Sequence, residues 1–191
     1  PNITLADLSG DVAFDLVLQN AYFKTNPDGT FTDYSSLLNT TAGNGDHIRI
    51  ADMNGDGLLD RVISHKNQLW VELNGADGSF TLGPAITLDR EINDFVVGYA
   101  PLDLDSNLQA IAATDNALVF VSFAPGGWTI QATVPTDLKS FSLALGDLNN
   151  DGLIEILAGG EKGARVYYTS FENLDQWREE VVLASTKAYS V

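Results

Sequence analysis

Short apolar runs recur along the whole chain, and glycine, asparagine or aspartate separates each run from the next. The runs are rich in valine, isoleucine and aromatic residues. Runs of this kind, bounded by turn-forming residues, are typical of β-strands. No segment keeps a helical period, and the nearest candidate, residues 171–180, ends in a β-rich run. The pattern therefore predicts an all-β chain.

The predicted strands follow a repeating order of four. In the second unit, strands are expected at 47–51, 61–64 and 69–73, and a fourth opens at Phe80 after a turn. Four strands in about 45 residues are typical of a blade of a β-propeller, and a blade needs neighbours because it cannot bury its faces alone. We expect one repeat domain over residues 1–191, with approximate blades at 1–45, 46–93, 94–138 and 139–186.

A carboxylate-rich loop connects the first two strands of a unit and occurs three times. The clearest copy runs from Asp52 to Asp60, and the others run from Asp147 to Glu155 and from Asp7 to Asp15. Oxygen-bearing side chains at alternate positions, with glycine to turn the backbone, match what Ca²⁺ requires. Successive copies therefore indicate an array of similar units that bind metal.

A degenerate copy is expected near residue 100, because the first positions of the clear copies are separated by 45 residues (7 to 52) and 95 residues (52 to 147). Residues 97–109 align there. Pro101 occupies the first ligand position and Gln109 the last, so two carboxylates remain at most. We expect this third loop to be metal-free or to bind weakly.

The Asp-x-Asn-x-Asp-Gly-x-x-Asp loop within a four-stranded unit resembles the integrin-α-like FG-GAP / VCBS repeat family, and the resemblance covers nearly the whole chain. It implies Ca²⁺ between the first and second strands of each competent blade. It also implies an extracellular, periplasmic or cell-surface location, with adhesion or carbohydrate binding as common roles. Of the FG and GAP sequence motifs that name the family, the chain has only the related segment Gly98-Tyr99-Ala100-Pro101.

The resemblance also implies the metal ligands, as side-chain oxygens and one backbone carbonyl per loop. In the second loop these are Asp52, Asn54, Asp56, Asp60 and the Leu58 carbonyl. In the fourth loop they are Asp147, Asn149, Asp151, Glu155 and the Leu153 carbonyl. In the first loop they are Asp7, Ser9, Asp11, Asp15 and the Ala13 carbonyl. Two departures affect the expected geometry, because Glu155 is one methylene longer than aspartate and Val12 stands where glycine is expected.

The loops have two other interpretations. An EF-hand needs flanking helices and an acid at position twelve, whereas that position holds Leu18, Ile63 and Ala158 between β-rich runs. Plain Asp/Asn/Gly turns remain an alternative, above all for the first loop. Ca²⁺ is favoured over Mg²⁺, because a flexible cage made only of protein oxygens suits the larger ion.

Charge and composition narrow the range of partners. The net charge of −16 repels nucleic acid and anionic lipid, so neither is an expected partner. No apolar run is long enough to span a bilayer, so membrane insertion is not expected either. The chain has no cysteine, which excludes disulfides and thiolate metal sites. The chain starts at Pro1 rather than methionine, which suggests processing or excision from a longer protein.

No catalytic residue can be named from the sequence. The two histidines, His47 and His65, are interpreted as ordinary residues at strand ends. The recurrent aromatic residues that open the fourth strands are expected to pack between blades; they are Phe31, Phe80, Trp128 and Trp177. Trp70, Tyr99, Tyr167 and Tyr168 are less regular, and any that are exposed would be better candidates for stacking on sugars.

The expected function is an extracellular Ca²⁺-binding recognition module for a glycan or a protein. Two alternatives are a segment of a polysaccharide-processing enzyme and a structural scaffold for assembly. Residues 187–191 resemble the start of a fifth unit, which suggests part of a larger ring. Open blade faces would then favour self-association, for example of two copies about a two-fold axis.

Overall fold

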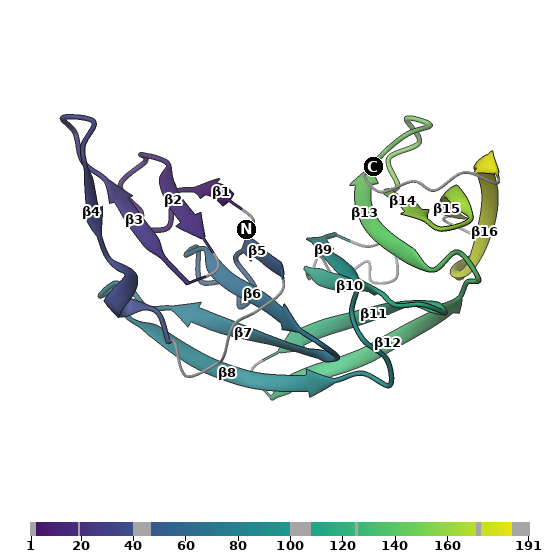
Figure 1. The fold of residues 1–191 in the computed structure, drawn as a ribbon, viewed down its shortest axis with the longest axis horizontal. Helices are drawn as coiled ribbons and strands as arrows, with labels where there is room; N and C mark the ends of the chain where they lie inside the picture. Colours follow the sequence, from purple (N-terminus) through teal and green to yellow (C-terminus); the bar gives the residue numbers. More distant parts are fainter. Residues whose placement is uncertain are drawn as a thin grey trace. The chain divides into compact units, whose positions relative to one another are not determined.

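The computed structural model describes residues 3–18, 20–39, 47–99, 108–124, 126–170 and 173–184. Its sixteen strands form four antiparallel sheets of four strands each (Figure 1). Within the described ranges the only helical segment is a 3₁₀ turn at Ser35–Leu37. No helix in these ranges is long and apolar enough to span a membrane. The predictions of an all-β chain and of four strands per unit are confirmed.

Two of the sheets come from the first half of the chain, and their strands are hydrogen-bonded in sequence order. The first sheet contains β1 (Ile3–Ala6), β2 (Asp15–Leu18), β3 (Tyr22–Thr25) and β4 (Phe31–Asp33). The second contains β5 (His47–Ala51), β6 (Asp60–His65), β7 (Gln68–Asn74) and β8 (Phe80–Thr87). The strand register makes positions in the two sheets equivalent. The pair Leu5 and Leu16 in the first sheet corresponds to the pair Ile50 and Arg61 in the second.

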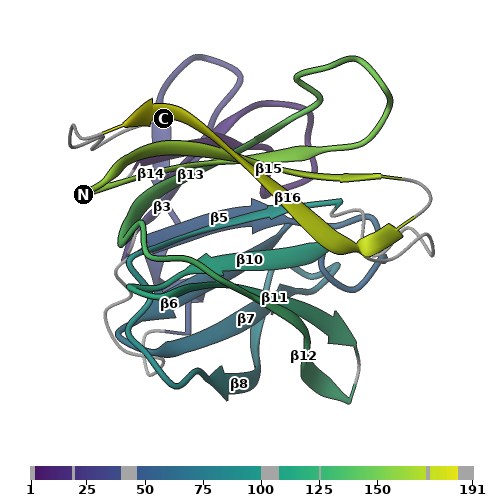
Figure 2. The same cartoon turned by 90° about the vertical axis from the view of Figure 1, so that its right-hand side faces the viewer.

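The other two sheets repeat this order. The third sheet contains β9 (Asp94–Gly98), β10 (Gln109–Ala113), β11 (Ala117–Ala124) and β12 (Gly127–Pro135). The fourth contains β13 (Ser140–Gly146), β14 (Glu155–Gly160), β15 (Gly163–Ser170) and β16 (Asn173–Ala184). Figure 2 shows β15 and β16 as a long, twisted pair. The segment considered as a helix candidate is thus strand from residue 173 onward.

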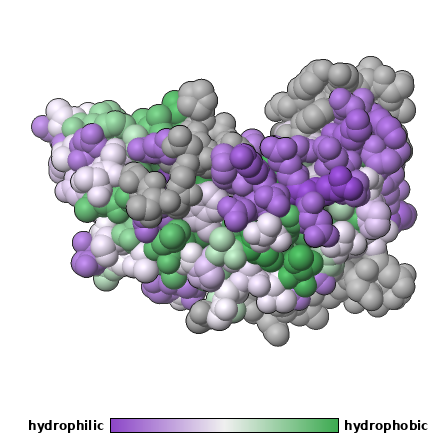
Figure 3. All heavy atoms as spheres, turned by 60° about the horizontal axis from the view of Figure 1, so that its bottom comes forward, coloured by the Kyte–Doolittle hydropathy of each residue, from purple (hydrophilic) through white to green (hydrophobic). Residues whose placement is uncertain are grey.

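The chain divides into two compact units. The first comprises Pro1–Thr87 with Ala124–Gly127, and the second comprises Leu88–Phe123 with Trp128–Val191. Each unit has its own apolar core between two sheets. The core of the first is built around Leu8, Val17, Tyr22 and Leu38, and that of the second includes Ile111, Leu118, Phe120, Leu143, Ile156 and Tyr167. On the face drawn in Figure 3, hydrophobic residues form separate patches among hydrophilic ones.

The recurrent aromatic residues differ in their packing. Phe80 opens β8 and packs on the first core, and Trp177 stacks on Phe120 with ring centroids 5.0 Å apart. Trp177 lies inside β16 rather than at its start. The prediction of packing is wrong for Phe31, which opens β4 but is 55% exposed, because it lies on the open face of the first sheet.

Several predicted features lie outside the described residues. Most of the degenerate third loop, residues 101–107, is among them, and so are the predicted start of a fifth unit at 187–191 and the segment 40–46. The other three loops are described in full. They connect β1 to β2, β5 to β6 and β13 to β14, which is the position predicted for them.

Candidate metal-binding loops and an adjoining pocket

The acid at position one closes each loop by accepting backbone N–H groups. Asp52 Oδ1 accepts from Gly55 and Asp56 at 2.8 and 3.1 Å, and its Oδ2 accepts from Gly57 at 2.8 Å. The bonds from positions five and six recur, from Asp11 and Val12 to Asp7 and from Asp151 and Gly152 to Asp147. Three different sequences therefore adopt one conformation around the first carboxylate.

Positions three and five are held by equally local bonds. Asn54 Oδ1 accepts the Asp56 N–H at 3.0 Å, and Asp56 Oδ1 accepts the Leu58 N–H at 2.8 Å. The equivalent bonds run from Asp151 to Asn149, from Leu153 to Asp151 and from Ala13 to Asp11. In the second and fourth loops, these short-range bonds thus hold the side-chain oxygens of positions one, three and five within one tight turn.

The backbone at position six has a positive φ in every loop. Gly57 and Gly152 have φ values of 87° and 88°, and Val12 has 75° at the same position. A β-branched residue rarely adopts this conformation because its side chain crowds the backbone. The first loop therefore keeps the turn geometry in spite of Val12, at the expense of local strain.

The acid at position nine is buried and reaches the base of the loop. Asp60 is fully buried; its Oδ2 accepts the Met53 N–H at 2.8 Å and its Oδ1 the Asn74 N–H at 2.9 Å. Burial is the main reason why the pKa of Asp60 is raised. Because Asn74 ends β7, this carboxylate ties the loop to the third strand of the sheet.

In the other two loops the position-nine acid also accepts backbone N–H groups of the loop. Asp15 accepts N–H groups from Leu8, Ser9 and Thr25, the last of which ends β3. Glu155 accepts the Leu148 N–H at 2.7 Å. In all three loops the position-nine acid therefore bonds to the amide of position two, and the longer glutamate side chain is accommodated.

The first loop differs from the others because a lysine on β3 pairs with one of its acids. The Lys24 ammonium group lies 2.9 Å from Asp11 Oδ2. The hydrogen bond from Lys24 is the largest cause that lowers the pKa of Asp11. The buried Ser9 Oγ makes no hydrogen bond of good geometry, although it lies close enough to influence the pKa values of Asp11 and Tyr22.

The oxygen donors of the second loop fit a hard cation. Carboxylates of Asp52, Asp56 and Asp60, the amide oxygen of Asn54 and a main-chain carbonyl are all ligands that Ca²⁺ accepts. Within the described ranges no three acidic or histidine side chains already surround a single point. A bound ion would thus need the carboxylates to converge, together with amide, main-chain or water oxygens.

The remaining candidates from the sequence are distributed across the fold. His47 begins β5 and His65 ends β6, as predicted. Trp70 and Tyr167 are buried, whereas Tyr99 is 61% exposed. Tyr168 is half-buried, and the Arg178 guanidinium lies 5.2 Å from its ring centroid. Tyr99 and Tyr168 are therefore the accessible members of this group.

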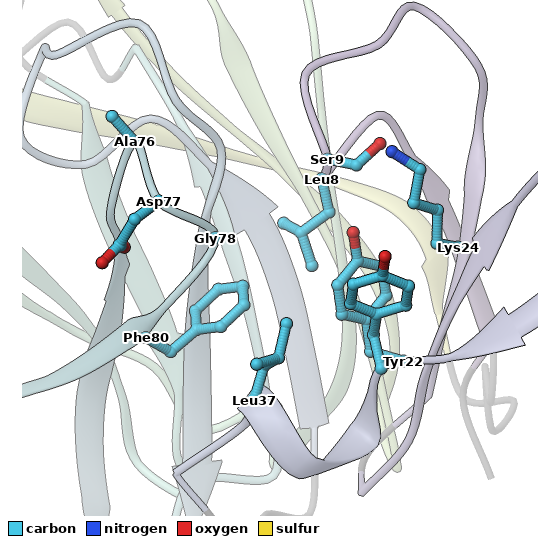
Figure 4. A pocket seen from close by; sticks show the side chains of 10 residues that line it. Leu8, Ser9, Tyr22, Lys24, Leu37, Ala76, Asp77, Gly78 and Phe80 are labelled. Atoms are coloured by element: carbon cyan, nitrogen blue, oxygen red, sulfur yellow. The ribbon is translucent and has the colours of Figure 1, made fainter.

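A pocket of about 220 Å³ adjoins the first loop and was not anticipated from the sequence. Its lining residues come from the first loop, β3, the segment 34–37 and the turn between β7 and β8 (Figure 4). They are Leu8, Ser9, Tyr22, Lys24, Tyr34, Leu37, Ala76, Asp77, Gly78 and Phe80. Tyr34 follows an unremarkable polar stretch, so no sequence signal singled it out.

Comparison with known proteins supports the fold. No protein-family model and no curated protein match the chain. Among solved structures, it resembles an Agrocybe aegerita lectin that specifically recognises non-reducing terminal N-acetylglucosamine, with a TM-score of 0.62 and 19% identity. The match covers 96% of this chain and 52% of the lectin.

Two further structures give a similar result. The chain matches BBS1N, solved in complex with ARL6DN, with a TM-score of 0.64 and 12% identity over 98% of this chain and 54% of that one. It matches a Lactobacillus plantarum protein with a TM-score of 0.51 and 14% identity over 86% and 50%. The chain thus spans about half the length of these structures. Together with the four four-stranded sheets, the likeness confirms the β-propeller fold.

Proposed function

We propose that the chain is a Ca²⁺-binding recognition module of the FG-GAP / VCBS type, with a glycan or a protein as its ligand. The observation that supports this most directly is the loop that is built in the same way three times, with oxygen-bearing side chains at positions one, three, five and nine. One ordinary Asp/Gly turn would not require this repetition. The proposal includes an extracellular, periplasmic or cell-surface location.

In this proposal Ca²⁺ has a structural role. The second loop would hold it through Asp52, Asn54, Asp56, Asp60 and the Leu58 carbonyl, and the fourth loop through the equivalent residues. Carboxylates packed together repel one another, and a divalent cation offsets that repulsion. Since Asp60 also accepts a bond from Asn74 at the end of β7, an ion at the second loop would stiffen the edge of the blade.

Ca²⁺ titration of chelator-treated protein tests the metal sites. Isothermal calorimetry should show binding at the second and fourth loops, and Ca²⁺ should raise the melting temperature by several degrees, because it binds the folded state. Asp52→Ala should remove one site, whereas Asp89→Ala, at an exposed acid outside the loops, should leave binding intact. Unchanged melting with millimolar Ca²⁺ and no heat of binding would refute the metal proposal.

The class of ligand is proposed from the fold neighbours. One neighbour is a lectin and another is held in complex with a protein partner, so a propeller fold can present either kind of surface. Glycan binding is the first choice, because a pocket lined by rings and polar groups lies beside the first loop. The segment of a polysaccharide-processing enzyme stays an alternative hypothesis.

An assembly role is a second candidate, supported by the open face of the first sheet. Ile3 and Leu5 are 61% and 62% exposed, whereas Ile48, which is equivalent to Ile3 by register, is 3% exposed. This face carries the residues that a neighbouring blade covers in the second sheet. We propose that a second copy of the chain covers it.

Sedimentation velocity tests this assembly. The wild-type chain should associate as its concentration rises, and a Leu5→Lys variant should be shifted toward the monomer. Ile130→Lys, which adds the same charge at another exposed apolar position, is the matched control. A wild-type monomer at every concentration would refute the self-association proposal and leave the metal sites to the calorimetric test.

A further inference from the structure

The pocket beside the first loop has an apolar end and a polar end. Leu8 is buried at 3% exposure and belongs to the core of the first unit, while Phe80 packs against that core from β8. The ring of Phe80 meets the Tyr22 ring edge-on, with centroids 6.4 Å apart. Figure 4 shows Phe80 and Leu37 together at the lower end of the pocket. This end offers carbon surface that is fixed by packing.

Hydroxyl and ammonium groups form the other end. In Figure 4 the Ser9 hydroxyl and the Lys24 ammonium group point toward each other above Tyr22. The Lys24 ion pair with Asp11 uses one of its three donors, and the direction of the other two is free to suit a ligand. Tyr34 lies with its ring 5.8 Å from that of Tyr22, and its hydroxyl makes no hydrogen bond to any described residue.

The acid at the pocket is already engaged. Asp77 Oδ1 accepts the Ser79 N–H at 3.0 Å and the Ser79 hydroxyl at 2.6 Å, and its side chain points away from the other lining residues in Figure 4. The pocket therefore presents mainly donors and hydroxyls rather than a free carboxylate.

We propose that this pocket binds one pyranose ring of a carbohydrate, an assignment that rests on the proposed recognition function. A sugar ring has a carbon-bound hydrogen face that packs on aromatic and aliphatic side chains, and a rim of hydroxyls that hydrogen bond. The two ends of the pocket match these two features. The volume of about 220 Å³ is below the roughly 300–1,000 Å³ of pockets for drug-sized ligands, so a single ring fits better than an extended ligand.

Two other ligand classes fit less well. The single cation of the pocket is already paired with Asp11, and the chain carries a net charge of −16, so a phosphorylated ligand would meet repulsion. A fatty or sterol ligand would leave the polar end unsatisfied, since Ser9, Lys24 and Tyr34 would lose water without gaining partners. A neutral, hydroxyl-rich ring satisfies both ends.

The first loop shapes one wall of this pocket. Leu8 and Ser9 occupy positions two and three of the loop, and Lys24 bonds to its position-five acid. The backbone N–H groups of Leu8 and Ser9 are in turn held by Asp15 at 3.1 and 2.9 Å. The loop that the sequence marks as a metal candidate therefore positions the residues that would contact the sugar.

Saturation-transfer difference NMR with four methyl glycosides, those of glucose, galactose, mannose and N-acetylglucosamine, tests the assignment. At least one should show transfer from the wild-type chain, and calorimetry should then give its dissociation constant. Tyr34→Phe should weaken binding roughly three- to tenfold, as expected when one net hydrogen bond is lost. Ala76→Trp should abolish binding, because it places a large side chain at the exposed wall of the pocket.

Matched variants separate the pocket from the rest of the protein. Ala124→Trp adds the same ring at an exposed position outside the pocket and should bind as the wild type does. Unchanged melting temperatures would show that each variant is folded. Full binding by Ala76→Trp would overturn the pocket and leave glycan recognition standing elsewhere. Absence of binding for all four glycosides would also refute the proposal that the pocket binds a sugar. The Ca²⁺ titration tests metal binding by the loops independently of this result.

Discussion

Lys24 on β3 and Asp11 in the first loop form an ion pair of 2.9 Å, and Asp11 holds the position that Asp56 and Asp151 hold in the other copies. The pKa of Asp11 is lowered, with the hydrogen bond from Lys24 as the largest cause, and the pKa of Lys24 is raised, chiefly by its bond to Asp11. A cation from the protein itself thus offsets one of the three carboxylate charges of this loop. The second and fourth loops have no equivalent ammonium group among the described residues.

This pair predicts that the first loop binds Ca²⁺ more weakly than the second. Lys24→Met keeps the aliphatic stem and removes the charge, so it should strengthen Ca²⁺ binding at the first loop. The measurement is calorimetric titration in a background of Asp52→Ala and Asp147→Ala, which isolates this loop. Lys162→Met, at a lysine paired with Asp137, is the control, and equal affinities in both variants would contradict the prediction.

Val12 predicts a stabilising substitution. Val12→Gly relieves a β-branched residue from a φ of 75°, a strain on the order of 1–3 kcal/mol, and costs up to about 1 kcal/mol in chain entropy. We expect a net gain of about 1 kcal/mol in the free energy of unfolding by denaturant titration in chelator. The reciprocal Gly57→Val should destabilise the chain, and a less stable Val12→Gly would show that the turn is not strained.

The buried pair of Arg61 and Glu72 predicts non-additive energetics. Their side chains are each 2% exposed; burial lowers the pKa of Arg61 and raises that of Glu72, in each case as the largest cause. Arg61→Leu or Glu72→Phe alone leaves a buried charge and should cost about 3–5 kcal/mol.

The double variant should recover much of that loss. By register the first sheet carries Leu16 and Phe23 at these positions, so Arg61→Leu with Glu72→Phe copies an apolar pair that the fold already uses. Denaturant titration of the two single variants and the double variant closes the cycle. Additive losses would contradict the prediction.

Tyr167 predicts an alkaline dependence of stability. Burial is the main cause that raises its pKa above the ordinary value of 10.0, and its hydroxyl donates to Thr136 Oγ1 at 2.8 Å. The folded state holds this proton more tightly than the unfolded chain, so stability falls as pH rises above about 10. Tyr167→Phe should show a shallower decline in melting temperature between pH 9 and 11 than the wild type, and Tyr99→Phe, at an exposed tyrosine, should follow the wild type.

Periodicity made most of the fold predictable. The apolar runs and the turn residues between them located four strands per unit, because strand formation and turn formation depend on local sequence. The position of the loops between the first and second strands followed from the same order. The packing of the aromatic residues did not. Phe31 and Phe80 open equivalent strands, and only the presence of a neighbouring sheet decides which of them packs against a core.

The candidate site was predictable only in part. The composition of the loops gave the oxygens at positions one, three and five, whose hydrogen bonds span two to five residues. The contact between Asp60 and Asn74 spans fourteen residues and requires the sheet to be formed. The pocket joins Ser9 to Phe80 from different sheets, a proximity that no local pattern contains.

The bond from position nine to the amide of position two has a consequence for how such repeats can diverge. Asp15, Asp60 and Glu155 all form this bond, although glutamate is longer than aspartate. The bond also persists when position three is serine or asparagine and when position six is valine or glycine. A copy could thus lose its affinity for an ion by mutation while this acid keeps the hairpin shut. Loops that no longer bind an ion would then remain folded, and a single array could contain both metal-binding and metal-free loops.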